Sequence, residues 1–450
     1  MIDLFASPWI PAAVLLLLTC GARLLCGGWL APSAFAGLLW STFVWGSVLV
    51  TDFPIHASAI WVIVLFVFAL QLGAFIGGNI VCKPPSEKIA QGNERGTAQS
   101  LCLTTLRFSG IFAILAFAGA VYFVYWSFWR FDLPASPVSF LAVGHLWSVQ
   151  YGDYGEVEPW LVRLTIMWVY PAALLGGMAF ATASNRKEKF FSLSPLLPSL
   201  LVGSAVAARS GILLSCICWI SGYLGIRNWQ SKGAYPLFRR RSVLVLTALG
   251  AGAVILFVLV DALRQSQDGQ TFDLALDSPR LLKYSLGSLA GFSSWFHQHV
   301  PGHPLLGAYT FSGFFDLLGL HHREIGLYQS FESLSGGLET NIYTAVRGFI
   351  QDFGLAGTVC ISFIVGLVSS MFFNHSSQKE WTTIVFGSAF YAFVLASPIT
   401  SIFTYNGLLL AWVVAALVLK FSFRPVGMRT STMSYPILPQ RLPSGQNTLL

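Results

Sequence analysis

Long apolar runs separated by short polar connections are the main pattern of this chain. A helix needs about 20 apolar residues to cross the roughly 30 Å of hydrocarbon in a bilayer. Eleven runs approach this length, and each predicts a membrane-spanning helix. The runs lie at about 8–27, 31–50, 58–81, 108–128, 161–184, 191–208, 210–226, 242–262, 354–373, 382–402 and 407–423. We therefore expect an all-α polytopic membrane protein, with residues 1–450 forming one integral membrane domain.

One connection, residues 261–354, is much longer than the others and holds five of the eight histidines. Its last part, TNIYTAVRGFIQDFG (Thr340 to Gly354), is aromatic and amphipathic and carries Arg347 and Asp352. This pattern predicts a large loop that contains short amphipathic helices and in which the polar chemistry concentrates.

Composition supports the same class. Hydrophobic residues make up 55% of the chain and charged residues only 10%, whereas about a quarter of a soluble domain is charged. No Lys or Arg precedes the first run, so we expect a retained span rather than a cleaved signal. The seven cysteines lie in or beside apolar runs without a CxxC pair, which favours buried free thiols.

The charges predict an orientation. The connections around Arg23 and at 82–107, 184–189, 227–241 and 374–380, together with the end of the chain from Lys420 onward, carry 18 of the 26 Lys and Arg. They hold only four of the 19 acidic residues, so the positive-inside rule places them in the cytoplasm. The N-terminus and the 261–354 loop are then outside, and residues 425–450 form a disordered cytoplasmic tail. The net charge of +7 follows this topology and does not indicate a nucleic-acid partner.

The cytoplasmic connections contain no Walker motif, no GxGxxG after a strand and no nucleotide-binding domain. An activated substrate must therefore come by another route. The chain also shows no inverted repeat of broken helices, which disfavours a secondary transporter.

Two arginines are candidate ligands for an anion. Arg209 stands among small residues in VGSAVAARSGILL, between two apolar runs; it either snorkels to the interface or grips phosphate with its guanidinium fork. Arg347 precedes Asp352 by five residues, which places the two side chains about 140° apart on a helix. This spacing favours separate roles over a local salt bridge. Arg347 is then a second phosphate ligand, and Asp352 holds a base or orients Arg347.

The histidines of FHQHVPGH are His297, His299 and His303. Zinc sites usually draw on i,i+4 spacing within a helix or on distant ligands, whereas these histidines lie in a loop with no carboxylate among them, so we expect no metal site. One of them can act as general base or phosphate donor. Asp316, in the aromatic segment FSGFFDLLGL, is either a proton acceptor with a raised pKa or a helix cap.

Aromatic residues are too frequent in the loop for a solvated segment, and Tyr309 and Tyr343 are among them. Packing at the membrane surface explains most of these side chains, while others can stack on sugar rings.

Three segments carry a resemblance to a known family: AVAARSGILLSCICWISGYL (Ala205 to Leu224), the region from Lys283 to Leu320 with KYSLGSLAGFSSWF and GAYTFSGFFDLLGL, and TNIYTAVRGFIQDFGLAGTVCISFIVGLVSSMFF (Thr340 to Phe373). In these segments the chain resembles the Wzy-type O-antigen polymerases and related oligosaccharide repeat-unit polymerases. The similarity covers about residues 160–420, and the first third is comparable only in hydropathy.

The resemblance implies a GT-C-like helical bundle in the bacterial inner membrane, with a periplasmic N-terminus and loop. It also implies a metal-independent glycosyltransferase that needs no cofactor. Such an enzyme moves a glycan from undecaprenyl diphosphate to the sugar hydroxyl of a second lipid-linked repeat unit, in O-antigen or exopolysaccharide synthesis. The partners are then this lipid-linked oligosaccharide, membrane lipids, a chain-length regulator and a flippase.

The resemblance also suggests roles for residues of the loop and of the hairpin at Arg209. Arg209 and Arg347 bind the diphosphate. The base is one of His297, His299, His303, Asp316 and Asp352. The substrate-binding residues are Asn341, Tyr343, Arg280, Tyr309, His297 and His299.

Two alternatives stay open. An O-antigen ligase uses the same donor but transfers the glycan to lipid A core, and FHQHVPGHPLLG is a partial match to the histidine-rich signature of that class. A polysaccharide flippase or transporter is disfavoured by the long loop. The paired arginine-to-glycine spacings of some polymerases do not match cleanly at Arg163 or Arg280, so models of sugar specificity built on them do not carry over.

Overall fold

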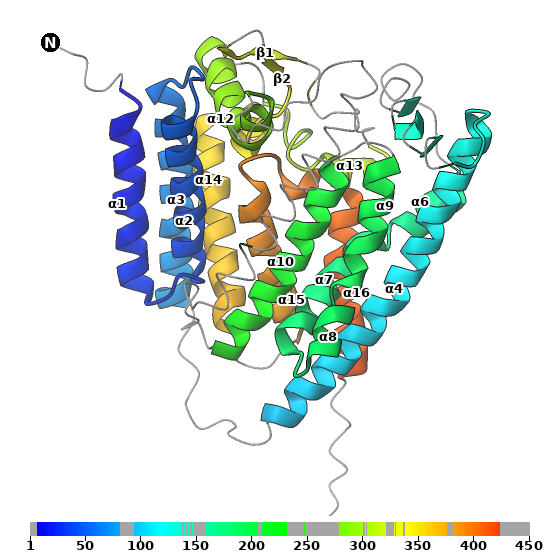
Figure 1. Cartoon of the computed structure of the whole chain (residues 1–450). Helices are drawn as coiled ribbons and strands as arrows, with labels where there is room; N and C mark the ends of the chain where they lie inside the picture. The colour runs from blue at the N-terminus through cyan, green and yellow to red at the C-terminus, as the bar shows by residue number, and fades with distance from the viewer. Residues whose placement is uncertain are drawn as a thin grey trace, which may run out of the picture.

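The computed structural model describes residues 7–81, 94–147 except 137, 138, 141 and 145, 159–205, 209–231, 247, 279–320 except 300, 301 and 303, 328–340 except 329, 336 and 337, 341–375 and 381–423. Its long helices run side by side as a bundle (Figure 1). We call the end of the bundle at which α1, α3 and α14 begin the loop end. The elements, in chain order, are α1 (Trp9–Cys26), α2 (Pro32–Val50), α3 (Ala57–Ile76), η2 (Gly77–Val81), α4 (Glu94–Arg130), α6 (Trp160–Ile166), α7 (Val169–Thr182), α8 (Arg186–Phe191), η3 (Ser194–Leu196), α9 (Leu197–Ala205), α10 (Arg209–Ser231), α12 (Pro279–Gln298), α13 (Ser312–Leu317), β1 (Glu332–Ser333), β2 (Glu339–Thr340), α14 (Ala345–His375), α15 (Trp381–Ala396), η6 (Ile402–Thr404) and α16 (Asn406–Ser422).

Seven helices in the described part of the chain are long and apolar enough to cross a membrane. They lie at Trp9–Cys26, Pro32–Val50, Ala57–Asn79, Ala98–Arg130, Trp160–Thr182, Ser210–Ser231 and Ala345–Phe373. Two shorter apolar helices, Trp381–Ala396 and Asn406–Ser422, run beside them. The prediction of an all-α polytopic membrane protein is confirmed.

Seven of the eleven predicted runs coincide with these seven helices, and the runs 382–402 and 407–423 coincide with the two shorter ones. The predicted run 191–208 contains η3 and the nine-residue α9, too short for one helix to cross a bilayer. Pro195 and Pro198, which lie where η3 gives way to α9, explain why no long helix starts earlier. The run 242–262 lies outside the described residues apart from residue 247, as does the predicted tail 425–450.

Glycines allow two pairs of helices to cross closely. A Cβ at Gly366 of α14 would collide with the carbonyl oxygen of Leu70 on α3, and a Cβ at Gly73 would collide with that of Phe363. A Cβ at Gly177 of α7 would likewise collide with the carbonyl oxygen of Trp219 on α10. Small residues at such crossings let helix backbones approach in a membrane, where lipid provides no hydrophobic drive for association.

The helix α14 is broken at Gly354, which has φ 67° and ψ −179°. This region of backbone space is essentially restricted to glycine. The break separates a buried first part, which carries Arg347 and Asp352, from the membrane-crossing remainder. The predicted start of a span at residue 354 coincides with this break.

Above the bundle, α12 and the β1–β2 hairpin cover the loop end (Figure 1). The two strands are antiparallel, with Glu332 opposite Thr340 and Ser333 opposite Glu339. The described parts of the predicted 261–354 loop are therefore ordered elements that pack on the helix ends.

Candidate anion-binding site at the loop end

Arg347 lies in the first turns of α14 and is only 4% exposed. The helix begins there because Ala345 N–H donates to the carbonyl oxygen of Ser397 (2.8 Å), while Val346 and Phe349 are fully buried in the bundle. Arg347 and Asp352 are the two buried charged side chains among the described residues.

Three aromatic rings surround the Arg347 guanidinium, and we call them the aromatic cage. The guanidinium carbon lies 3.8 Å from the ring centre of Tyr343, 4.0 Å from that of Tyr328 and 4.9 Å from that of Trp295. Tyr343 is held in place because its hydroxyl donates to the carbonyl oxygen of Ser330 (2.7 Å). Each cation–π contact contributes about 0.5–2 kcal/mol, depending on desolvation.

The polar partners of Arg347 are all neutral. Its Nη2 donates to Ser330 Oγ (2.9 Å) and its Nε makes a long contact with Gln351 Oε1 (3.4 Å). Its Nη1 is buried without a hydrogen-bond partner. No described carboxylate pairs with this cation, although an unpaired buried charge costs several kcal/mol in desolvation. The site is therefore electrostatically suited to an incoming anion.

Residues around the guanidinium leave other polar atoms unsatisfied. Thr344 Oγ1, one turn before Arg347, is buried without a hydrogen-bond partner. Thr400 Oγ1 is also buried without one; it lies in the same connection as Ser397, whose carbonyl oxygen accepts the N–H of Ala345. Buried hydroxyls of this kind normally bind ordered water.

Asp352 has different partners from Arg347. Its carboxylate accepts the backbone N–H groups of Tyr309 (3.1 Å) and Thr310 (2.6 Å). The backbone carbonyl groups near the break are also used, since Leu305 N–H donates to Gln351 O (3.3 Å) and Leu306 N–H to Asp352 O (3.1 Å). Asp352 therefore fastens the 305–310 segment to α14. Among the described residues, the contacts of Asp352 are those of a loop anchor and include no bond to Arg347.

Two tyrosines connect this segment to the cage. Tyr309 stacks on Tyr328, with ring centres 5.3 Å apart and an angle of 16° between the planes. Tyr328 meets Tyr343 edge to face (5.1 Å, 78°). Burial raises the pKa of Tyr328 far above its usual value, so its ring faces Arg347 as a neutral phenol. Asn341 is half-buried two residues before Tyr343.

Two predicted histidines lie at the end of α12, in different surroundings. His297 is exposed and stacks on His56, which precedes α3 (4.1 Å, 7°). The ring of His299 lies 4.3 Å from that of Trp295, on the wall of the cage. Burial, and to a smaller extent the charge of Arg347, lower the pKa of His299, so this histidine is neutral near pH 7.

Asp316 lies apart from the cage. Its Oδ2 accepts a hydrogen bond from Asn406 Nδ2 (2.6 Å), which ties α13 to the first residue of α16. Of the remaining predicted residues, the side chains of Arg209 and Arg280 and the whole of His303 lie outside the described residues. Within the described part of the chain, no group of three His, Cys, Asp or Glu could hold a metal ion.

Sequence reasoning missed Ser330 and Gln351 as partners of Arg347. The i,i+4 spacing from Arg347 to Gln351 is a usable signal, because side chains at this spacing meet on a helix. Ser330 could not have been found this way, since it comes from a segment distant in sequence. Trp295 and Tyr328 were predicted only as part of a general aromatic excess.

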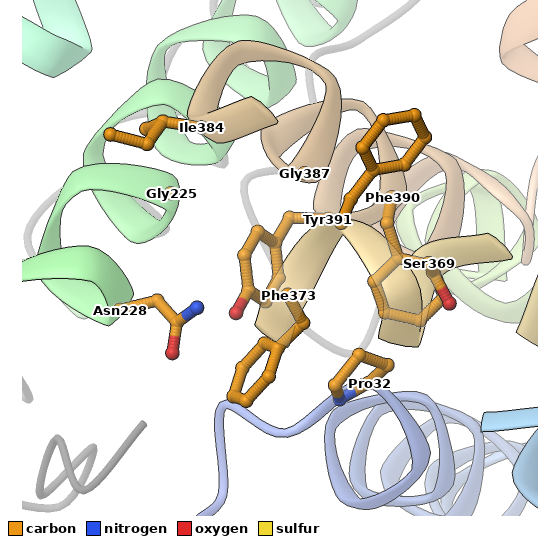
Figure 2. A pocket seen from close by; sticks show the side chains of 10 residues that line it. Pro32, Gly225, Asn228, Ser369, Phe373, Ile384, Gly387, Phe390 and Tyr391 are labelled. Atoms are coloured by element: carbon orange, nitrogen blue, oxygen red, sulfur yellow. The ribbon is translucent and has the colours of Figure 1, made fainter. Parts of the chain in front are cut away.

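Two other cavities lie away from this site. Figure 2 shows one between α2, α10, α14 and α15, lined by Asn228, Ser369 and Tyr391 among others. Its volume of about 10 Å³ suits a single water, and the buried Asn228 Oδ1 has no partner there. An apolar groove of about 400 Å³ runs between α1 and α3. The Arg347 site differs from both in combining buried charge with aromatic rings.

The fold and this site define a polytopic helical membrane protein with a buried cation at one end of its bundle, which has no carboxylate partner among the described residues. Comparisons with protein-family models, with curated proteins and with solved structures found no match for the chain.

Proposed function

We propose that this protein is a membrane glycosyltransferase that polymerises lipid-linked oligosaccharide repeat units, with Arg347 binding the diphosphate of an undecaprenyl diphosphate-linked donor. The observation that carries the proposal is the guanidinium of Arg347: buried, caged by three aromatic rings and without a carboxylate partner among the described residues.

The neutral contacts of Arg347 suggest how an anion reaches it. Ser330 is exposed, and its hydroxyl occupies the position in front of Nη2 that a phosphate oxygen would take. Replacing a hydroxyl acceptor by an anionic oxygen gives a shorter and roughly twofold stronger hydrogen bond. A small displacement of Ser330 therefore exposes the cation and gains a charged partner for it.

In the proposed reaction, the acceptor sugar hydroxyl attacks the anomeric carbon of the donor glycan. The bond between that carbon and the diphosphate oxygen breaks, and its electron pair leaves with the lipid diphosphate. A positive charge fixed in a water-poor site stabilises this developing anion, and one such group typically accounts for about 10²–10³-fold in rate. Arg347 is placed for this task.

The proton of the acceptor hydroxyl needs a base. Asp352 is committed to backbone N–H groups and Asp316 to Asn406. His299 lies on the cage wall with a lowered pKa, and a neutral imidazole is able to accept the proton. Among the described candidates, His299 is the base we favour; Arg209, Arg280 and His303 keep their predicted roles as hypotheses.

The orientation belongs to the same proposal. The loop end then faces the periplasm, with the N-terminus periplasmic, the C-terminus cytoplasmic and the protein in the bacterial inner membrane. The charge distribution supports this arrangement, since the described basic residues near the C-terminal ends of α1 and α10 and on α8, among them Arg23 and Arg227, lie at the opposite end.

The test is incubation of the reconstituted protein with one chemically defined undecaprenyl diphosphate-linked repeat unit. A ladder of longer lipid-linked glycans supports the proposal. Arg347→Gln should reduce ladder formation by about 10²–10³-fold, whereas Arg163→Gln, an exposed arginine of α6, should leave it unchanged.

Two outcomes would reject it. Glycan transfer that occurs only after addition of lipid A core identifies a ligase. Movement of the repeat unit across the bilayer without chain growth identifies a transporter.

A further inference from the structure

Six apolar side chains of residues 305–320 are exposed at the loop end, and we call them the leucine shelf. They are Leu305 (48%), Leu306 (76%), Phe314 (44%), Leu317 (69%), Leu318 (69%) and Leu320 (68%). Soluble surfaces rarely expose apolar side chains in such close succession without a partner.

The polarity of α13 is reversed relative to a helix on a water-facing surface. Its serine, Ser312, is only 3% exposed, and its acid, Asp316, is hydrogen bonded to Asn406 of α16. Phe314 and Leu317 of the same helix point outward. Polar groups facing protein and apolar groups facing outward are what a hydrocarbon environment selects.

Four backbone N–H groups of the shelf are hydrogen bonded within the protein. The N–H groups of Leu305 and Leu306 donate to carbonyl groups of α14, and those of Leu318 and Leu320 donate to the carbonyl groups of Phe314 and Phe315. A segment in contact with lipid must satisfy its backbone groups internally, because each unsatisfied group there costs several kcal/mol.

Leu306 adds an independent sign. Its φ is 50°, in the left-handed region that favours Gly, Asn or Asp, yet the position holds a leucine that is 76% exposed. Burial within the protein does not offset this strain. An apolar contact outside the protein would offset it.

The height of the shelf fits the edge of a bilayer. Asp316 binds Asn406, the first residue of the apolar helix α16, so α13 lies where this apolar helix begins. In Figure 1, α13 is at the height of the upper ends of α9 and α10, whereas α12 and the β1–β2 hairpin lie higher. Leu355, 46% exposed directly after the break in α14, continues the apolar surface downward.

We propose that the leucine shelf inserts into the hydrocarbon of the bilayer leaflet at the loop end. The 305–310 segment links it to the anion site, since Asp352 binds its backbone and Tyr309 stacks on Tyr328. Lipid contact thus holds the outer side of the segment that supports the aromatic cage.

The test uses the full-length protein in phosphatidylcholine vesicles that contain a phospholipid with a diazirine on its acyl chain. After illumination, peptides are analysed by mass spectrometry. We expect the 304–320 peptide to carry as much label as the exposed face of α4, and at least about tenfold more than the β1–β2 peptide. The double variant Leu306→Asn, Leu318→Asn should lower labelling of that peptide about threefold.

Two controls keep the result interpretable. Asn is tolerated at the φ of residue 306, so this substitution leaves the loop conformation intact. Phe331→Asn removes another exposed aromatic side chain, 60% accessible, next to β1, and should not change labelling of the 304–320 peptide.

Hydroxyl-radical footprinting of the same vesicles completes the test. Shelf leucines that are oxidised by water-borne radicals and carry no lipid label would overturn the proposal. Leucines protected from both reagents would also overturn it, because a protein partner would then cover the shelf.

Discussion

The two parts of α14 lie in one continuous stretch of chain but face different surroundings. Before Gly354, the helix is enclosed: Val346, Phe349 and Asp352 are fully buried, and Arg347 nearly so. After Gly354, the outer face of the helix is open, with Leu355, Ile364 and Val368 each at least 40% exposed.

The two parts also pack by different means. The first part uses side-chain hydrogen bonds and aromatic rings. The ring of Phe349, for example, meets Phe66 at a tilt (6.0 Å, 36°) and Phe393 edge to face (6.2 Å, 75°). The second part crosses α3 at Gly366, where backbones touch without side chains between them. Close packing of backbones at a glycine crossing stabilises the fold. A buried charge lowers stability, because removing it from water costs free energy. Removing the buried charge of Arg347 should therefore raise stability, whereas adding a side chain at the glycine crossing should lower it.

The largest effect is expected at the glycine crossing. In Gly366→Leu, the new side chain meets the backbone of Leu70, which cannot move away as a flexible side chain would. We expect a loss of about 4 kcal/mol or more, enough to prevent recovery of folded protein. The yield of monodisperse protein and its thermal unfolding measure this.

The matched control for the crossing is Gly110→Leu on α4, where a Cβ meets nothing within 4 Å. This variant should fold normally. Equal behaviour of the two variants would show that α3 and α14 do not cross closely.

The next effect is expected at Asp352, which anchors the 305–310 segment. In Asp352→Asn, the amide offers one acceptor oxygen and brings N–H groups toward backbone N–H groups of Tyr309 and Thr310. Leaving a buried donor unsatisfied costs about 1–3 kcal/mol. Thermal unfolding should show this loss, while Asp132→Asn, at an exposed acid, should match the wild type. An unchanged melting temperature for Asp352→Asn would exclude the anchoring role.

The break between the two parts is itself open to test. Gly354→Ala has room for its Cβ, but alanine rarely adopts φ 67° with ψ −179°. We expect a destabilisation of about 1–3 kcal/mol from the backbone alone. If α14 were instead straight in the membrane, the same substitution would stabilise it, because alanine is the better helix former.

The apolar runs of the sequence predicted some helices of the bundle correctly and others incorrectly. The apolar runs predicted the membrane-crossing remainder of α14 and its start near Gly354, since hydrophobic length follows directly from bilayer thickness. The same rule failed for α9, where prolines interrupt an apolar run that remains uniform in composition. Pattern alone also gave too short an α4, which extends over the polar residues before 108 because these are compatible with a helix.

At the site, sequence spacing indicated that Arg347 and Asp352 do not face each other, and their partners indeed differ. The identity of those partners could not be derived. Ser330 and Tyr309 reach the two side chains through tertiary packing of separate loop segments, for which the sequence has no periodic signal.

A smaller effect of opposite sign is expected at Arg347. Methionine has a similar length and needs no hydrogen-bond partner, so Arg347→Met removes the desolvation cost of an unpaired cation while losing three cation–π contacts. We expect a gain of about 1 kcal/mol in stability together with loss of glycan chain growth. A fall in the melting temperature would show that the cage already compensates the charge fully, and that no anion is needed.

The smallest effect concerns pH and the histidines beside the enclosed part. Burial, followed by the nearby charge of His297, lowers the pKa of His56 from its usual 6.5. The unfolded chain therefore binds a proton at a higher pH than the folded protein does. The stability that goes with a neutral His56 is therefore complete above pH 6.5, and it is lost as the pH falls from 6.5 to the lower pKa of His56 in the folded protein. Because both imidazoles are largely exposed, we expect a decrease of only about 1–2 °C in melting temperature between about pH 7.5 and pH 5.

His297→Phe keeps the ring stack without its charge and should reduce this decrease, as should about 0.5 M salt. A pH response that the variant and salt both leave unchanged would assign the effect to groups elsewhere in the protein.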